Sequence, residues 1–239
     1  MQYYIFKEAV DTKETGPIFP QIQKWKPRYD EDKANSYYSY YEASHRGSTF
    51  PNFPPDLDAL IIDGRATLTD LISSNISIGF IISSKLKSIF DKFNFPSHRF
   101  YPAKLIYKKA EVDGYYLMHL ISNYFEDYLD YINYSQSTFT ITGINGKSIQ
   151  SITLESKQEY LEKSKQLQEE ALIKKIFVSI SAHKICFNSN FDKDLDCFMA
   201  PFGIDYYISE RLRNALLKNA ITGCDVTSTD KLLFNKAHI

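Results

Sequence analysis

The tripeptide Gly146-Lys147-Ser148 matches the end of a phosphate-binding loop, in which backbone N–H groups cradle phosphates and the lysine binds them. The full motif requires another glycine five residues before Gly146, and Ile141 occupies that position. The preceding Asn145 offers a simpler explanation, because an Asn-Gly pair tolerates the positive φ angles of a tight hairpin turn. The sequence therefore predicts a hairpin here and no nucleotide site.

The histidines and cysteines lack the spacing of a metal site or of a local catalytic motif. They are His45, His98, His119, His183 and His238, with Cys186, Cys197 and Cys224. No C-x-x-C, H-x-x-x-H or G-x-S-x-G sequence occurs. His183 precedes Cys186 by three residues, and on one strand the two side chains would point to opposite faces. We expect reduced cysteines, no metal and no cofactor; a hydrolase-like enzyme whose catalytic groups meet only in the fold is the alternative.

Carboxylates and tyrosines are concentrated between residues 124 and 131. The acidic members are Glu126, Asp127 and Asp130, and the aromatic members are Tyr124, Tyr128 and Tyr131. Two of the carboxylates could act as an acid–base pair. A solvated acidic surface explains the composition better, and complementary charge would guide a basic partner protein to it. We take these six residues as a candidate partner-binding surface.

A second group of tyrosines, near the N-terminus, is another candidate contact surface. Its members are Tyr37, Tyr38, Tyr40 and Tyr41. Tyrosine is enriched at protein interfaces because it combines a large ring with a hydroxyl group. The pattern fits either a strand or a loop, and the same cluster could join two copies in a homodimer.

The balance of charge disfavours a nucleic-acid partner. The chain carries 28 basic and 29 acidic residues in 239, whereas nucleic-acid binders concentrate positive charge. Neither a signal peptide nor an apolar run of the roughly 18 residues that span a membrane is present, so we expect a cytoplasmic protein that does not enter membranes. Hydrophobic residues make up 44% of the chain, which is ample for a core without metal or disulfide bonds.

The order of the predicted elements indicates an α+β fold with mostly antiparallel or mixed sheets. Residues 3–6 predict a strand, and the proline-rich stretch from 11 to 55 predicts irregular structure. Asp113-Gly114 and Asn145-Gly146 predict the turns of two hairpins. Residues 155–174 predict a charged surface helix with a narrow apolar stripe of Tyr160, Leu161, Leu167 and Leu172, and residues 175–180 predict a strand. We expect residues 1–55 to pack as a Pro- and Tyr-rich segment on a main domain of residues 56–239.

Two strand–helix units resemble one another at a distance of 126 positions. In each, an apolar strand ends at a serine, Ser83 or Ser209, and a leucine follows three residues later, Leu86 or Leu212. The serines are placed to cap the helices, and we interpret the match as an internal repeat rather than as two chance joints.

The second unit carries the sequence Ser209-Glu210-Arg211-Leu212, and Thr222-Gly223 follows the helix. These motifs resemble the C-terminal element of the eleventh immunity family of bacterial polymorphic toxin systems, formerly a domain of unknown function, and of its close relatives. Further segments resemble earlier elements of that family: 82–86, 113–117 and 130–139. The resemblance covers roughly residues 55 to 227.

The resemblance implies that the protein binds and neutralises a cognate toxin. Ser209, Glu210 and Leu212 fit structural roles as a cap, a first-turn carboxylate and a core anchor, so they do not identify the contact surface. Inhibition by binding needs only complementary surface with a few aromatic anchors. The alternatives are the enzyme described above and a homo-oligomeric structural or regulatory module.

Overall fold

The structure is a computed structural model that describes residues 2–26, 29–58, 60–121, 128–203 and 205–234. Within these residues the chain forms 14 strands in three sheets and 5 α-helices, which confirms the predicted α+β class. No helix in the described part of the chain is long and apolar enough to span a membrane.

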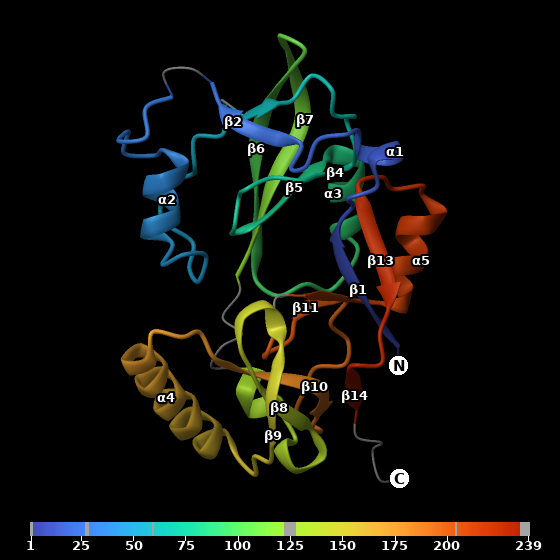
Figure 1. Cartoon of the computed structure of the whole chain (residues 1–239). Coiled ribbons are helices and arrows are strands. Elements are labelled where there is room, and N and C mark those ends of the chain that lie inside the picture. The colour runs from blue at the N-terminus through green and yellow to red at the C-terminus, as the bar shows by residue number, and fades with distance from the viewer. Residues whose placement is uncertain (1, 27–28, 59, 122–127, 204, 235–239) are drawn as a thin grey trace.

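The strands form a large sheet, a terminal sheet and a lower sheet (Figure 1). The large sheet has the order β2 (Ile22–Trp25), β3 (Leu60–Ile62), β6 (His98–Tyr107), β7 (Ala110–Leu120), β5 (Gly79–Ser83) and β4 (Leu71–Ile72). The terminal sheet has the order β11 (Cys197–Met199), β12 (Tyr206–Ser209), β1 (Tyr3–Glu8) and β13 (Cys224–Ser228). The lower sheet has the order β14 (Leu232–Phe234), β10 (Ser179–Phe187), β8 (Thr138–Thr142) and β9 (Ser148–Ile152). Only the pairs β3–β6 and β10–β14 are parallel among the described strands.

Five α-helices lie around these sheets. They are α1 (Thr12–Thr15), α2 (Tyr37–Ala43), α3 (Ser84–Phe90), α4 (Lys157–Lys174) and α5 (Glu210–Lys218). Single 3-10 turns are found at η1 (Tyr128–Tyr131), η2 (Tyr134–Gln136) and η3 (Ile144–Gly146).

The two predicted serine caps are present and have the same geometry. The Ser83 hydroxyl accepts a hydrogen bond from the Leu86 N–H at 3.2 Å, and the Ser209 hydroxyl accepts one from the Leu212 N–H at 3.1 Å. Each cap satisfies a backbone donor that the first turn of a helix would otherwise leave free, which contributes about 1 kcal/mol. Both leucines are fully buried.

The repeat extends well beyond the strand and the helix. In the first unit the sheet order is β4-β5-β7-β6, and in the second it is β11-β12-β1-β13. The strand registers agree, because Ser83 lies opposite Tyr115 on β7 and Ser209 lies opposite Tyr3 on β1. The N-terminal strand β1 therefore completes the C-terminal unit, in the position that β7 has in the first unit.

An aspartate joins each serine cap to the other unit. Asp196 accepts hydrogen bonds from the Ser209 hydroxyl and the Arg211 guanidinium of its own unit, and from the Asn94 N–H that follows α3. Reciprocally, Asp70 accepts from Ser83 and Lys85 of its own unit, and from the Thr222 N–H that follows α5.

These two contacts tie the helix of each unit to the sheet of the other. Asp196 is fully buried, so these partners replace the hydrogen bonds to water that its carboxylate loses, while Asp70 is partly exposed.

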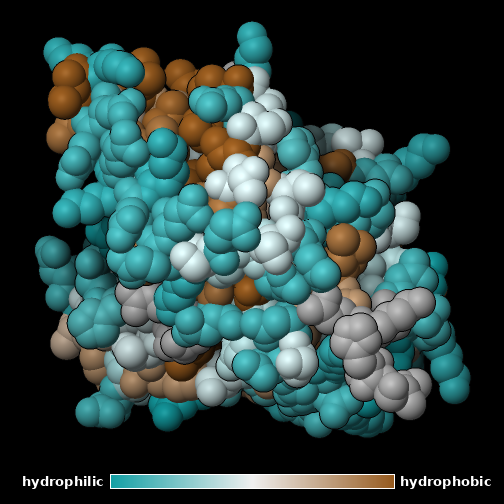
Figure 2. All heavy atoms as spheres, turned by 90° about the horizontal axis from the view of Figure 1, so that it is seen from below, coloured by the Kyte–Doolittle hydropathy of each residue, from teal (hydrophilic) through white to brown (hydrophobic). Residues whose placement is uncertain are grey.

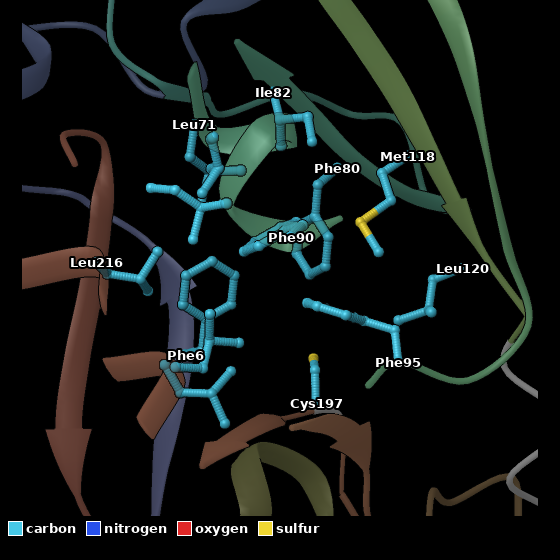
Figure 3. Close-up of a cluster of buried hydrophobic side chains, with 14 of the residues drawn as sticks. Phe6, Leu71, Phe80, Ile82, Phe90, Phe95, Met118, Leu120, Cys197 and Leu216 are labelled. Atoms are coloured by element: carbon cyan, nitrogen blue, oxygen red, sulfur yellow. The ribbon is translucent and has the colours of Figure 1, made fainter. Parts of the chain in front are cut away.

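Between the two units lies a core of aromatic and aliphatic side chains (Figure 3). Phe6 on β1 meets the rings of Phe80 and Phe90 edge to face, with centroids 5.6 and 6.4 Å away. Leu216 reaches the same cluster from α5. Burying these side chains stabilises the contact between the units, since each contributes about 1.5–3 kcal/mol.

Both predicted hairpins exist, but one turn lies elsewhere. The β6–β7 turn is at Lys108 and Lys109, which both have positive φ angles, rather than at Asp113-Gly114. Asp113 and Gly114 lie inside β7 opposite Lys104, where the register shifts by one residue. Gly114 has φ +83, and such a glycine suits a β-bulge as well as a turn. The β8–β9 hairpin is as predicted, although its connection is a longer loop that contains η3.

The tyrosine cluster forms helix α2, which is neither the strand nor the loop that the sequence left open. Its Ser36 cap accepts a hydrogen bond from the Ser39 N–H. Tyr40 is fully buried, and its hydroxyl lies 2.7 Å from Nδ1 of His119. The other ring nitrogen of His119 lies 3.1 Å from the Gly47 carbonyl, so a neutral imidazole satisfies both contacts.

The stretch from 11 to 55 is less irregular than predicted, because α1, β2 and α2 lie within it. Strand β1 belongs to the same sheet as β12 and β13. The division of the chain at residue 55 stays a prediction.

Replacing Asp196 with asparagine should lower the free energy of unfolding by about 2 kcal/mol, because the buried charged acceptor of the Ser209, Asn94 and Arg211 hydrogen bonds becomes a neutral amide that turns a donor toward one of them. Urea denaturation followed by circular dichroism measures this. Asp130→Asn is the matched control: its carboxylate is largely exposed and pairs with Lys157 at 2.8 Å, so a loss below about 0.5 kcal/mol is expected. Equal losses in the two variants would refute the role of Asp196.

Burial lowers the pKa of His119 below its ordinary value of 6.5. On acidification the unfolded chain takes up this proton first, so the His119 contribution to stability is present above pH 6.5 and is lost as the pH falls. His119→Gln should therefore lose less stability than the wild type between about pH 7.5 and pH 5.5. Urea midpoints at both pH values measure the difference. An equal fall in the midpoint of both proteins between the two pH values would contradict the expectation.

Candidate interaction surface

Helix α4 lies on the lower sheet through a narrow inner face. Ser156 caps the helix by accepting a hydrogen bond from the Glu159 N–H. Tyr160, Leu167 and Ala171 are the positions that turn toward the sheet. The predicted helix is confirmed, but its predicted stripe is partly wrong: Leu161 and Leu172 are exposed.

A groove runs between α4 and β10. Two hollows of about 410 and 460 Å³ share four lining residues and so form one depression, the α4 groove. The shared residues are Gln168, Phe177, Val178 and Ser179. The groove exists because Ser164 and Ala171, which alternate with Tyr160 and Leu167 along the inner face, are too small to fill the space.

Apolar side chains gather where α4 turns into β10. Lys175 ends the helix in the left-handed conformation, with φ 53, and β10 begins only at Ser179. The predicted strand over 175–180 is therefore wrong for residues 175–178, which precede β10 and do not belong to the sheet. Four large side chains on this turn are exposed, and we name them the apolar patch: Leu172 (81%), Ile173 (82%), Ile176 (51%) and Phe177 (62%).

The β8–β9 hairpin adds to this surface. Ile144 and Ile149 are both more than half exposed. The space beside Gly143 is bounded by the Ile149 side chain and the Phe177 carbonyl, which places the hairpin next to the patch. Viewed from below, apolar side chains gather at one corner, on the side where α4 lies in Figure 1 (Figure 2).

A solvated helix end usually carries polar side chains, so this surface needs an explanation. Large exposed apolar groups that lie side by side mark surfaces that other molecules cover, whereas single exposed ones are ordinary. The rest of α4 follows the ordinary pattern, with hydrogen bonds such as Gln158–Glu162 at its surface.

The predicted acidic surface is only partly described. Tyr124, Glu126 and Asp127 lie outside the described residues. Asp130 is exposed and pairs with Lys157.

Tyr128 and Tyr131, from the same predicted surface, are half-buried. Both rings pack against Phe191 in the core of the lower sheet.

The tyrosines of α2 divide between surface and core. Tyr37 and Tyr40 are buried, Tyr41 is half-buried and Tyr38 is exposed. Trp25 stacks on Tyr37 and contacts Tyr38. This cluster therefore offers mainly Tyr38 to a partner.

The enzyme alternative predicts a pocket that contains His119 or His183 beside carboxylates. His119 is fully buried between Tyr40 and Gly47, and His183 is exposed on β10. Neither lines the α4 groove. Among the described residues, no three His, Cys, Asp or Glu side chains are grouped as metal ligands.

No curated protein matches this chain. The sequence does match the immunity protein family (Imm11), and the match runs from residue 5 to residue 230. It includes β1 from its third residue on, the other elements of both repeated units, α4, and the lower sheet except for β14. The chain belongs to the immunity protein family (Imm11).

Proposed function

We propose that this protein binds a cognate bacterial toxin in the cytoplasm of the producing cell and neutralises it. Membership of the immunity protein family is the observation that carries this function. Inhibition by binding requires no catalytic group in the immunity protein, since a covered active site is inactive whatever covers it.

The apolar patch and the α4 groove are the surface that we propose for the toxin. Interfaces gain most of their affinity from a few large side chains that become fully desolvated, and Phe177 with its three neighbours can supply such a centre. The groove beside it can accept a side chain from the partner. A stable interface covers about 800 Å² on each partner, so the hairpin residues Ile144 and Ile149 would lie within the same footprint.

The double variant Ile173→Asp with Phe177→Asp tests this surface. Both side chains are mostly exposed, so the fold should tolerate the change, while charge at the centre of an apolar interface should weaken binding at least about 30-fold. The probe is the protein encoded beside this chain in its own genome. Growth rescue on co-expression and calorimetric titration of the purified pair measure neutralisation and affinity.

Leu217→Asp is the matched control, because Leu217 is an exposed leucine (61%) on α5, away from the patch. It should rescue growth as the wild type does. Rescue by the double variant at full strength would exclude the patch. If neither the wild type nor any variant rescues growth, the protein encoded beside this chain is not its toxin. Light scattering of the isolated chain shows whether the patch joins two copies instead.

The acidic tyrosine surface is our second candidate for the same function. Reversing Glu126, Asp127 and Asp130 to lysine should weaken binding if the toxin presents a basic face, and the effect should shrink as salt is added. Titration of the triple variant at two ionic strengths measures this. An unchanged dissociation constant would exclude this surface and leave the apolar patch.

A further inference from the structure

Glu8 breaks the correspondence between the two units. On β1 the side chains of Tyr4 and Phe6 face the core, and alternation along the strand puts Glu8 on the same face. Its counterpart on β7 is Leu120. Tyr3 on β1 corresponds to Tyr115 on β7, since each lies opposite the capping serine, and Glu8 and Leu120 follow these tyrosines at the same distance along their strands. Leu120 is almost fully buried in the core. The second unit therefore has a carboxylate where the first has an apolar side chain.

A second replacement lies beside the first. Gly79 on β5 corresponds to Asp205, which precedes β12. Gly79 approaches β7 closely: a Cβ at this position would lie 1.8 Å from the Met118 carbonyl oxygen. In the first unit the backbone of β7 occupies the position where a side chain of residue 79 would lie, whereas the second unit carries the Asp205 carboxylate at the corresponding residue.

Both carboxylates line one cavity of about 520 Å³ between β1, β5 and β12. This volume lies within the range of small-molecule sites. Most of its wall is apolar, and the rings of Phe80 and Tyr206 lie side by side in it with centroids 4.6 Å apart. Met199 and Phe6 contribute further apolar surface.

Glu8 has few partners in the described structure. Its carboxylate accepts one hydrogen bond, from the Ser74 N–H at 3.3 Å, and no described cation is close enough to affect it. Lys7 lines the cavity but is exposed and belongs to the opposite face of β1. Lys231 interacts with Asp205, the second carboxylate of the cavity, rather than with Glu8.

We propose that this cavity binds a small organic cation, an ammonium or guanidinium group on a short aliphatic chain, with the Glu8 carboxylate as its main partner. The aliphatic chain would contact Phe6 and Met199, and the charged end would lie near the aromatic rings, which attract cations. This proposal concerns the terminal sheet and is independent of the toxin surface on α4.

The titration of Glu8 supplies a sensitive readout. Burial raises its pKa to about 7, so at that pH about half of the molecules carry a proton there. A cation held beside the carboxylate favours the charged form, and binding at pH 7 should release up to about half a proton. The heat of binding will then depend on the ionisation enthalpy of the buffer.

The experiment is calorimetric titration of the full chain with n-butylguanidinium at pH 7, in phosphate and in HEPES, two buffers that differ in ionisation enthalpy and carry no net positive charge. We expect saturable binding whose enthalpy differs between the buffers. The neutral isostere n-butylurea should bind at least ten-fold more weakly. Glu8→Gln should weaken n-butylguanidinium binding at least ten-fold and abolish the buffer dependence, while Glu111→Gln, at an exposed position on β7, should change neither.

Equal affinity for n-butylurea, equal binding by Glu8→Gln, or no saturable binding would each overturn the proposal. The stability of Glu8→Gln shows that the variant folds. The folded pKa of Glu8 lies above the unfolded value, so its contribution to stability is present below about pH 4.5 and is lost as the pH rises through about 7. Glu8→Gln should therefore have a higher urea midpoint than the wild type at about pH 8, and the ligand should reduce that difference.

Discussion

The reciprocal contacts of Asp70 and Asp196 are the constraint on which the arrangement of the two units depends. Each aspartate fixes the serine that starts one helix and binds the segment that leaves the other helix. A carboxylate buried as deeply as Asp196 is tolerated only where hydrogen bonds and a cation compensate for lost solvation, so its partners cannot shift independently. The cap, the ion pair and the approach of the two units are therefore one coupled interaction.

This coupling involves the two units and leaves the lower sheet and α4 outside it. The two units form a common hydrophobic core, and β8, β9, α4 and β10 lie between them in the sequence. Since the lower sheet has a core of its own, the α4–β10 turn can expose apolar side chains without opening the core between the units. The binding surface that we propose there therefore adds little cost in stability.

Local signals in the sequence were sufficient for the caps and for α4. A serine before a helix satisfies backbone groups within its own turn, so the caps at Ser83 and Ser209 require no tertiary information. Signals with two physical explanations were not sufficient. The positive φ of Gly114 suits a bulge as well as a turn, and Lys108 and Lys109 adopt that conformation without being glycine.

The apolar patch was missed for a related reason. The sequence predicts a helix over 155–174 followed by a strand over 175–180, and nothing in the local pattern indicates that Leu172, Ile173, Ile176 and Phe177 face solvent. The acids at 126 and 127 lie outside the described residues, so the sequence remains the basis for that half of the candidate site.

The equivalence of β1 and β7 was hidden by chain order, because the second unit takes its last strand from the start of the chain. Once the registers are aligned, the differences between the units become informative. Positions that keep the same character in both, such as Leu86 and Leu212, are explained by packing. Where a buried leucine in one unit becomes a carboxylate in the other, packing is not an explanation, because burying that group without a cation opposes folding. The cavity at Glu8 is such a position, and a ligand that supplies the missing charge would account for it.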